Sequence, residues 1–263
     1  EHAEDVTSEP IGVNYRVAPE VGGIWAEPVA ARKGVTILYL FGGGYVLGSP
    51  ASRRKTAGHI ANKARARVLV PSYRVAPEHQ FPAALDDAVA AYRWLLSEGA
   101  DAGRTVVAGD SSGGGLAVAT LLALRESGTA MAGGCVAMSP WADLRCEGES
   151  MHTRAGVDIM CTRDSLLEMA GWYLGSHDAN DPLASPVDAD LGNLPPLLAL
   201  VGSDEVLLDD ARRLVVGVAQ GGADATLFVG AGMQHVWPTW AGALPEADTA
   251  IAMIGEWVRA HTS

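Results

Sequence analysis

The stretch from Val106 to Leu116, VVAGDSSGGGL, constrains the fold more than any other part of the sequence. It contains a G-x-S-x-G pattern centred on Ser111, between a short apolar run and a longer run of helix-forming residues. This order predicts a strand, a tight turn and a helix, and the small residues let the turn close without steric clash. A turn of this kind projects the serine hydroxyl above the sheet, so Ser111 is the candidate nucleophile. A glycine-rich turn with an incidental serine would show the same short pattern, so the rest of the chain has to decide.

Strands and helices alternate along most of the chain. The stretches 11–17 and 22–28 predict an antiparallel edge hairpin, and the apolar run 35–41 is typical of a strand buried on both faces. Further strands are expected at 68–71, 105–108, 134–138, 197–202 and 225–229, and helices at 52–66, 82–97, 116–125, 164–174, 207–220 and 245–261. This alternation predicts an α/β fold with a doubly wound, mostly parallel sheet.

The length of 263 residues and the hydrophobic content of 48% suit a single α/β domain covering residues 1–263. Residues 141–195 interrupt the alternation, because they are richer in polar residues and turns and contain no clear buried strand. An insertion at the carboxyl end of a strand is placed to cover a site. We therefore expect a small cap at about residues 141–195.

The charge and the cysteines exclude several classes of function. The net charge of −12, with one short basic run at residues 53–55, argues against nucleic acid or an anionic membrane surface as a partner. The three cysteines are an odd number without C-x-x-C spacing, so neither a disulfide framework nor a zinc site is expected. The first residues lack the pattern of a secretory leader, and no run of about 18 apolar residues occurs. These features favour a reducing compartment and a cytoplasmic protein.

A serine nucleophile requires a base, and His235 lies just beyond the last predicted strand. At this place a histidine can reach the carboxyl end of the sheet, where Ser111 is expected. The other histidines lie at the termini, on a predicted helix, in an early loop or in the insertion: His2, His59, His79, His152, His177 and His261. They show no H-x-H or H-E-x-x-H spacing, so no metal is expected.

The base needs an acid that orients it, and four acids follow the predicted strand 197–202. Asp204 comes first after the strand and is the preferred candidate over Glu205. Asp209 and Asp210 fall in the first turns of the next predicted helix, where an acid complements the helix dipole. The resulting chain order of serine, acid and histidine is the order found in α/β-hydrolases.

Several longer motifs resemble those of the hormone-sensitive-lipase-like family of bacterial carboxylesterases, near its monoterpene-lactone-hydrolase-like members. They are GGGYVLGS at 42–49, YRVAPEHQFPAA at 73–84, GDSSGG at 109–114, SPWAD at 139–143, DEVLLD at 204–209 and HVW at 235–237. The resemblance implies an α/β-hydrolase fold and a triad of Ser111, Asp204 and His235. It also implies an oxyanion hole formed by Gly43, Gly44 and the N–H of Ser112.

Two positions depart from this family pattern. The family usually has a histidine before its three glycines, where this chain has Phe41, so the oxyanion loop is either less rigid or held by apolar contacts. Family members also usually carry a longer N-terminal helical segment, whereas about 34 residues precede the first central strand here. Either the chain is trimmed or the cap is built mainly from residues 141–195.

The sequence thus predicts a serine carboxylic-ester hydrolase that acts on small to medium acyl esters through an acyl-enzyme, without metal or organic cofactor. The alternatives are a lactone hydrolase, a biosynthetic cyclase or lyase that reuses the fold, and a non-catalytic binding module. The strand at 225–229 is the last in the chain, and an exposed edge there predicts a homodimer. In the opposing interpretation, the closing helix covers that edge.

Overall fold

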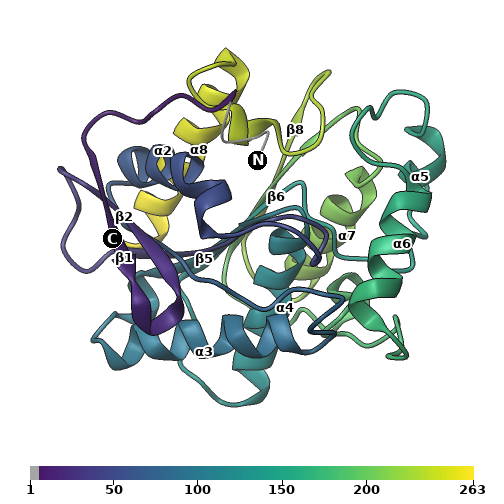
Figure 1. Ribbon diagram of the computed structural model, residues 1–263, viewed down its shortest axis with the longest axis horizontal. Helices are drawn as coiled ribbons and strands as arrows, with labels where there is room; N and C mark the ends of the chain where they lie inside the picture. Colours follow the sequence, from purple (N-terminus) through teal and green to yellow (C-terminus); the bar gives the residue numbers. More distant parts are fainter. Residues whose placement is uncertain (1–5) are drawn as a thin grey trace.

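A single sheet of eight strands forms the centre of the computed structural model, which describes residues 6–263 (Figure 1). The strands lie in the order β1-β2-β4-β3-β5-β6-β7-β8. Their bounds are β1 Val13–Ala18, β2 Gly23–Pro28, β3 Thr36–Leu40, β4 Arg67–Val70, β5 Thr105–Asp110, β6 Gly134–Met138, β7 Leu197–Gly202 and β8 Ala225–Gly230. β1 and β2 run antiparallel to their neighbours, and the strands from β4 to β8 are parallel. The predicted sheet and its N-terminal edge hairpin are confirmed.

The helices are α2 Arg54–Ala64, α3 Ala83–Ser97, α4 Ser112–Glu126, α5 Ser150–Thr153, α6 Arg163–Leu174, α7 Leu208–Gln220 and α8 Pro245–His261. Because strand-helix-strand connections are right-handed, the direction of each step along the sheet decides which face its helix covers. The steps β4 to β5, β5 to β6 and β7 to β8 share one direction, so α3, α4 and α7 cover one face. The step from β3 to β4 is reversed and places α2 on the other face, beside α8 (Figure 1).

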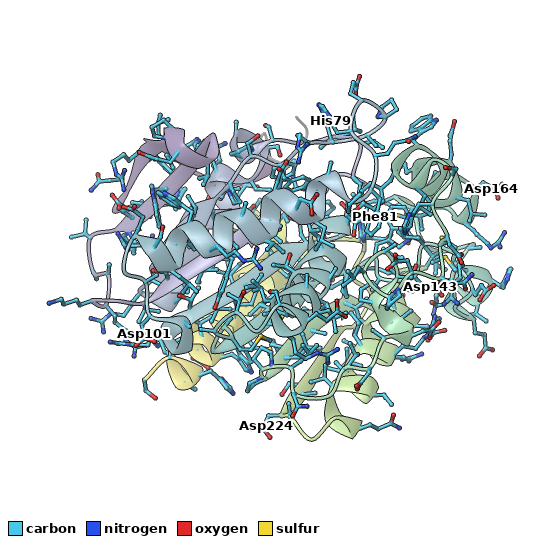
Figure 2. All side chains as sticks on the ribbon, turned by 90° about the horizontal axis from the view of Figure 1, so that it is seen from below. His79, Phe81, Asp101, Asp143, Asp164 and Asp224 are labelled. Carbon is cyan, nitrogen blue, oxygen red and sulfur yellow. The ribbon has the colours of Figure 1, made fainter. Side chains whose placement is uncertain are left out.

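The parallel strands bring their carboxyl ends to one edge of the sheet, and the loops that follow them meet there. Figure 2 shows Phe81, Asp143 and Asp164 on the same side of the molecule, away from Asp101, which precedes β5. Phe81 follows β4, Asp143 follows β6 and Asp164 belongs to α6, so the insertion lies at the carboxyl end of the sheet. A site built there can use side chains from several loops at once.

The central strands of the sheet form the core of the protein. Every residue of β3, β5, β6 and β7 is buried, because helices cover both faces of these strands. β8 lies at the edge of the sheet and is only partly covered, since α8 packs over β6 and β7 instead. None of the helices within residues 6–263 is long and apolar enough to cross a membrane.

Helix α4 begins four residues earlier than predicted, at Ser112 instead of residue 116. The glycines at 113–115 are buried in the first turns of the helix. Small residues are needed here because the start of α4 lies against neighbouring backbone. A Cβ on Gly115 would lie 2.0 Å from the carbonyl oxygen of Trp141.

Asp210, in the first turn of α7, is fully buried and joins this helix to the segment that follows β6. Its Oδ2 accepts hydrogen bonds from the backbone N–H groups of Ala142 (2.8 Å) and Asp143 (2.9 Å). Its Oδ1 has no hydrogen-bond partner within the described residues. Burial raises the pKa of Asp210 to about 7, and the neighbouring Asp143 carboxylate contributes in the same direction.

We expect this carboxyl group to make stability fall between about pH 4 and about pH 7. The folded-state pKa of Asp210 lies above the unfolded value of about 3.9, so the folded protein holds more protons in this range and loses stability as the pH rises. Asp210→Asn removes this titration. Between about pH 4 and about pH 7, the unfolding free energy of the variant should therefore fall by up to about 4 kcal/mol less than that of the wild type. Urea unfolding at both ends of the range measures the difference. Asp209→Asn removes a charge from the same turn as a control, and an equal loss of pH dependence there would contradict the assignment.

Candidate active site

Ser111 occupies the sharp turn between β5 and α4, with φ 55° and ψ −125°. Its N–H donates to the carbonyl of Met138 (2.8 Å), and its own carbonyl accepts from the N–H groups of Gly114 (2.9 Å) and Trp141 (2.9 Å). A positive φ is unfavourable for a residue with a side chain, so the surrounding bonds must hold it. The result is a serine whose position is set by β6, by α4 and by the start of the insertion.

Two glycines allow this turn. A Cβ on Gly109 would lie 2.1 Å from the carbonyl oxygen of Gly113, and a Cβ on Gly113 would lie 2.1 Å from the carbonyl oxygen of Leu40. Neither distance is compatible with any side chain, because both neighbours are backbone atoms. The G-x-S-x-G spacing is therefore required by the close crossing of β5, α4 and the end of β3.

His235 lies between Ser111 and a carboxylate. Its Nε2 is 2.9 Å from Ser111 Oγ, and its Nδ1 is 2.9 Å from Glu205 Oε2. The ring is buried, and the loop that follows β8 carries it. With the proton on Nδ1 donated to the carboxylate, Nε2 is free to accept the serine proton.

The prediction of Asp204 as the acid is wrong, because Glu205 is the carboxylate that reaches His235. Asp204 faces away: its Oδ1 accepts from Ser203 Oγ (2.8 Å), and its N–H donates to Met233 (3.3 Å). After β7 ends, residues 203–204 form a turn, and the longer side chain of Glu205 folds back toward the end of the strand. No signal in the sequence distinguishes two adjacent acids that differ in this way.

Ser139, the first residue of the SPWAD motif, lies beside the acid, although the sequence predicts no role for it. Its Oγ donates to Glu205 Oε1 (2.7 Å) and accepts from the N–H of Val236 (3.0 Å). The same Oε1 also accepts from the N–H of Gly202. The acid is thus held on both oxygens, and one hydroxyl connects the loop of the acid to the loop of His235.

Asp158 and Gln234 join the insertion to the same two loops, and the sequence predicts neither contact. Asp158 Oδ2 accepts from the N–H of Val206 (2.8 Å), directly after the acid, while Oδ1 accepts from Cys161 (2.8 Å) within the insertion. Gln234, directly before the histidine, donates through Nε2 to the carbonyl of Val157 (3.0 Å). These contacts place residues 157–161 beside the acid and the histidine.

Electrostatic effects on His235 oppose one another. Burial lowers the pKa of His235, but Cys161 and the Glu205 carboxylate raise it by more, so the pKa lies above its ordinary value. A carboxylate beside Nδ1 has this effect because it stabilises the imidazolium form.

Among residues 6–263, no three His, Cys, Asp or Glu side chains come together as they would to hold a metal ion.

The loop after β3 lies beside Ser111, as the predicted oxyanion loop should. Gly43 and Gly44 adopt φ values of 139° and 63°, a region that favours glycine. Within the described part of the chain, the N–H groups of Gly43, Gly44 and Ser112 donate to no acceptor. The Ser112 group is also the first N–H of α4, which lies at the positive end of the helix dipole.

Phe41 helps to fix this loop by apolar contact, the second of the two expectations for this position. Its buried ring stacks on Tyr73, with centroids 4.0 Å apart and planes within 9°. The hydroxyl of Tyr73 donates to the carbonyl of Phe41. Further along, the N–H of Tyr45 donates to Ser112 Oγ (3.2 Å), which ties the loop to the start of α4.

Helix α6 of the insertion packs directly on the loop. Tyr173 stacks on Tyr45 with centroids 3.9 Å apart, and its carbonyl accepts from the N–H of Phe81 (2.8 Å). Met169 lies over Gly44, where an added Cβ would be 2.1 Å from the thioether sulfur. The space next to the three free N–H groups is therefore bounded by the insertion.

Comparison with known proteins agrees with this geometry. The family model described as the alpha/beta hydrolase fold matches residues 37–239. An acetyl-hydrolase of Streptomyces hygroscopicus is 48% identical over 238 residues, which cover 90% of this chain and 79% of the relative. An esterase of Acinetobacter venetianus is 32% identical over 239 residues, covering 90% of this chain and 79% of the relative.

Solved structures show the same relationship. The crystal structure of an esterase from the bacterial hormone-sensitive lipase family superposes with a TM-score of 0.96 and 43% identity, covering 100% of this chain and 90% of that chain. A structure of EstE5 soaked with p-nitrophenyl butyrate gives a TM-score of 0.94 and 40% identity, covering 99% of this chain and 89% of that chain. The chain belongs to the hormone-sensitive-lipase family of α/β-hydrolases.

Proposed function

We propose that Ser111, His235 and Glu205 form the catalytic triad of this chain, which is a carboxylic-ester hydrolase. The observation that carries the proposal is the unbroken contact from Ser111 Oγ through His235 to the Glu205 carboxylate, with both distances 2.9 Å. The ester chemistry is supported by the acetyl-hydrolase and esterase relatives. Glu205 replaces Asp204 in the role predicted for the acid.

The geometry supports a two-step acyl transfer. His235 Nε2 takes the proton of Ser111 Oγ as the oxygen attacks the ester carbonyl, and it then returns this proton to the departing alcohol. Glu205 keeps the ring oriented and stabilises the imidazolium that forms. Water then attacks the acyl-serine, with His235 again taking a proton, and the acid product leaves. No metal or organic cofactor enters these steps.

The N–H groups of Gly43, Gly44 and Ser112 are the proposed donors to the oxyanion. All three are free of other acceptors in the described chain, and Ser112 adds the positive end of the α4 dipole. Donors that are already aimed at the developing charge stabilise the transition state more than the ground state. The positions of the Gly43 and Gly44 N–H groups therefore depend on the contacts that fix the loop after β3.

The proposed substrates are esters with small to medium acyl groups. Met169 of the cap, residues 141–195, lies over Gly44 and limits the space beside the oxyanion donors. The relatives support this class, since they include the acetyl-hydrolase of Streptomyces hygroscopicus and an ethyl acetate hydrolase of Pseudomonas putida. A lactone is a cyclic ester and would react by the same steps, so lactone hydrolysis stays a prediction.

We expect Ser111→Ala to remain folded and to lose ester hydrolysis by several orders of magnitude, because the nucleophile is removed. Initial rates on p-nitrophenyl acetate, butyrate and octanoate measure the loss, and the wild type should prefer the two shorter esters. A fluorophosphonate probe followed by peptide mass spectrometry should label Ser111 alone. Labelling at the buried neighbour Ser112, or full activity in Ser111→Ala, would contradict the proposal.

Glu205→Gln should reduce kcat far more than Asp204→Asn does. Only the carboxylate at Nδ1 stabilises the imidazolium and fixes the ring tautomer; an acid-to-amide change at this position costs about 10⁴-fold in a well-studied serine protease triad. Asp204 is adjacent in sequence but bonds to Ser203 and Met233, so it is a matched control. Steady-state kinetics on one short ester tests the pair. A larger loss in Asp204→Asn would show that the acid had been assigned to the wrong residue.

A homodimer through the edge of β8 is proposed as the assembly. β8 is the outermost strand next to β7, and within residues 6–263 helix α8 packs over β6 and β7 rather than along β8. Val229 on β8 and Val216 on α7 are exposed by 38% and 53%. A row of unpaired backbone groups beside exposed apolar side chains favours pairing with the same strand of a second copy.

Light scattering during size exclusion at micromolar concentration should therefore give the mass of a dimer, and Val229→Lys should shift it to a monomer by placing a charge at the edge. Val17→Lys places the same charge on β1 at the opposite edge, where the valine is exposed by 68%. This control should remain dimeric. A monomeric wild type would remove the proposal.

The proposed compartment is the cytoplasm. Cys135, Cys146 and Cys161 are free thiols in the structure, and Cys135 and Cys146 are buried. Free, buried thiols suit a reducing environment. Burial also raises the pKa of Cys135 to about 12, which keeps this thiol in its unreactive form.

A further inference from the structure

The carboxylate of Asp110, the residue before the nucleophile, is fully buried and collects hydrogen bonds from three parts of the chain. Oδ1 accepts from the hydroxyl of Tyr39 (2.8 Å) and from the backbone N–H of Gly42 (3.0 Å). Arg53 donates from Nε to both oxygens (3.0 Å each) and from Nη2 to Oδ2 (2.8 Å). One side chain is thus bonded to the end of β3, to the glycine loop and to the segment before α2.

Two of these partners, Gly42 and Arg53, are the first and last residues of the segment 42–53, which contains the proposed oxyanion loop. A single carboxylate therefore binds both ends of this segment. Between them, the N–H of Tyr45 donates to Ser112 Oγ (3.2 Å). The loop is therefore bonded to Asp110 and Ser112, the residues on each side of Ser111.

Packing leaves little freedom at the first of these contacts. A Cβ on Gly42 would lie 2.4 Å from Asp110 Oδ2 and 2.9 Å from the Cβ of Ser111. The carboxylate thus fills the space directly beneath the loop. A glycine is needed at position 42 because any side chain would push the loop away from the nucleophile.

The charge of the carboxylate has to be compensated at this place. An isolated buried carboxylate is costly, and a negative charge close to the nucleophile would oppose the oxyanion. The side chain of Arg53 is exposed by only 12% and pairs with Asp110. Burial lowers the pKa of Arg53, but the Asp110 carboxylate raises it by more, so the guanidinium remains charged. The pair brings rigid bonds to the loop without leaving a net charge beneath it.

We propose that Asp110, neutralised by Arg53, is a positioning residue for the oxyanion loop. It touches no substrate; it holds the Gly43 and Gly44 N–H groups in place relative to Ser111 Oγ through its bond to Gly42. The inference rests on the proposed function, because it assigns the loop its role in that reaction. Disturbing Asp110 should therefore weaken stabilisation of the transition state and leave ground-state binding of the ester nearly unchanged.

Asp110→Asn is the first test, because the amide keeps the shape and one acceptor but loses the charge. Losing one oxyanion donor costs about 10²–10³ in rate, so partial misalignment should lower kcat by about 10- to 100-fold with a much smaller change in KM. The affinity for a phenylboronic acid, which forms a tetrahedral adduct on Ser111, should fall in parallel with kcat. A lower melting temperature with unchanged kcat and boronate affinity would reduce Asp110 to a structural role and overturn the proposal.

Arg53 variants test the neutralisation. Arg53→Met leaves the carboxylate unpaired and should lower kcat by more than Asp110→Asn does, whereas Asp110→Asn/Arg53→Met should recover part of this loss. Arg53→Lys keeps the charge but not the bidentate geometry and should lie between the wild type and Arg53→Met. If Arg53→Met does not fold, Arg53→Gln, which keeps a hydrogen-bond donor but removes the charge, takes its place, and a kcat equal to that of the wild type in Arg53→Gln overturns the neutralising role.

A matched control exists on the surface. Arg74 and Asp87 form a bidentate pair of the same kind, but both side chains are partly exposed. Asp87→Asn should change kcat by less than about twofold, since exposed pairs contribute little. Fluorophosphonate labelling distinguishes a failure of the positioning role of Asp110 from a failure of the proposed triad. A wild type labelled at Ser111 whose Asp110→Asn variant is fully active contradicts only this inference, whereas a wild type that is not labelled contradicts the proposed function.

Discussion

The strained backbone of Ser111 is the constraint on which the functional end of the molecule depends. A residue with a side chain at φ 55° and ψ −125° costs about 1–3 kcal/mol, so the turn persists only because its neighbours leave no alternative. Gly109 and Gly113 let backbone approach backbone, and the carbonyl of Ser111 accepts the N–H of Trp141, where the insertion begins. Ser111, the sheet and the start of the insertion are thereby bonded to one another at one residue.

Hydrophobic packing stabilises the sheet, whereas buried carboxylates hold the loops around this turn in place. Loops at the carboxyl ends of strands leave backbone N–H groups without strand partners, and a buried acid satisfies several of them with strong, charge-assisted bonds. Among the described residues, such acids include Asp110, which accepts from Gly42, Asp158, which accepts from Cys161 and Val206, Glu205, which accepts from Gly202 at the end of β7, and Asp210, which accepts from Ala142 and Asp143. The geometry of the site therefore depends on ionisable groups that do not all react.

The sequence predicts the sheet, the nucleophile turn and the place of His235, because these follow from periodicity and from a motif that sterics require. The choice of acid could not be predicted in the same way. Asp204 and Glu205 are adjacent, and the one that faces His235 is selected by Ser139 and by the N–H of Gly202, which bind Glu205 Oε1. Ser139 is 66 positions away in the chain. A contact of that kind has no signature in local composition, and the expectation that the first acid after the strand would contact His235 failed for this reason.

At position 41 this chain has phenylalanine where the family usually has histidine, and other contacts compensate for the change. A histidine at this position can hydrogen-bond to backbone near the glycine loop, and phenylalanine cannot. Here stacking on Tyr73, the bond from the Tyr73 hydroxyl to the Phe41 carbonyl and the bond from Tyr45 to Ser112 Oγ restrain the same segment. The Asp110 carboxylate adds the restraint closest to the donors. These contacts come from Tyr73 and from Asp110 and Ser112 on the two sides of Ser111. Several contacts therefore restrain the glycine loop together, and the residue before the glycines can change without leaving the loop unsupported.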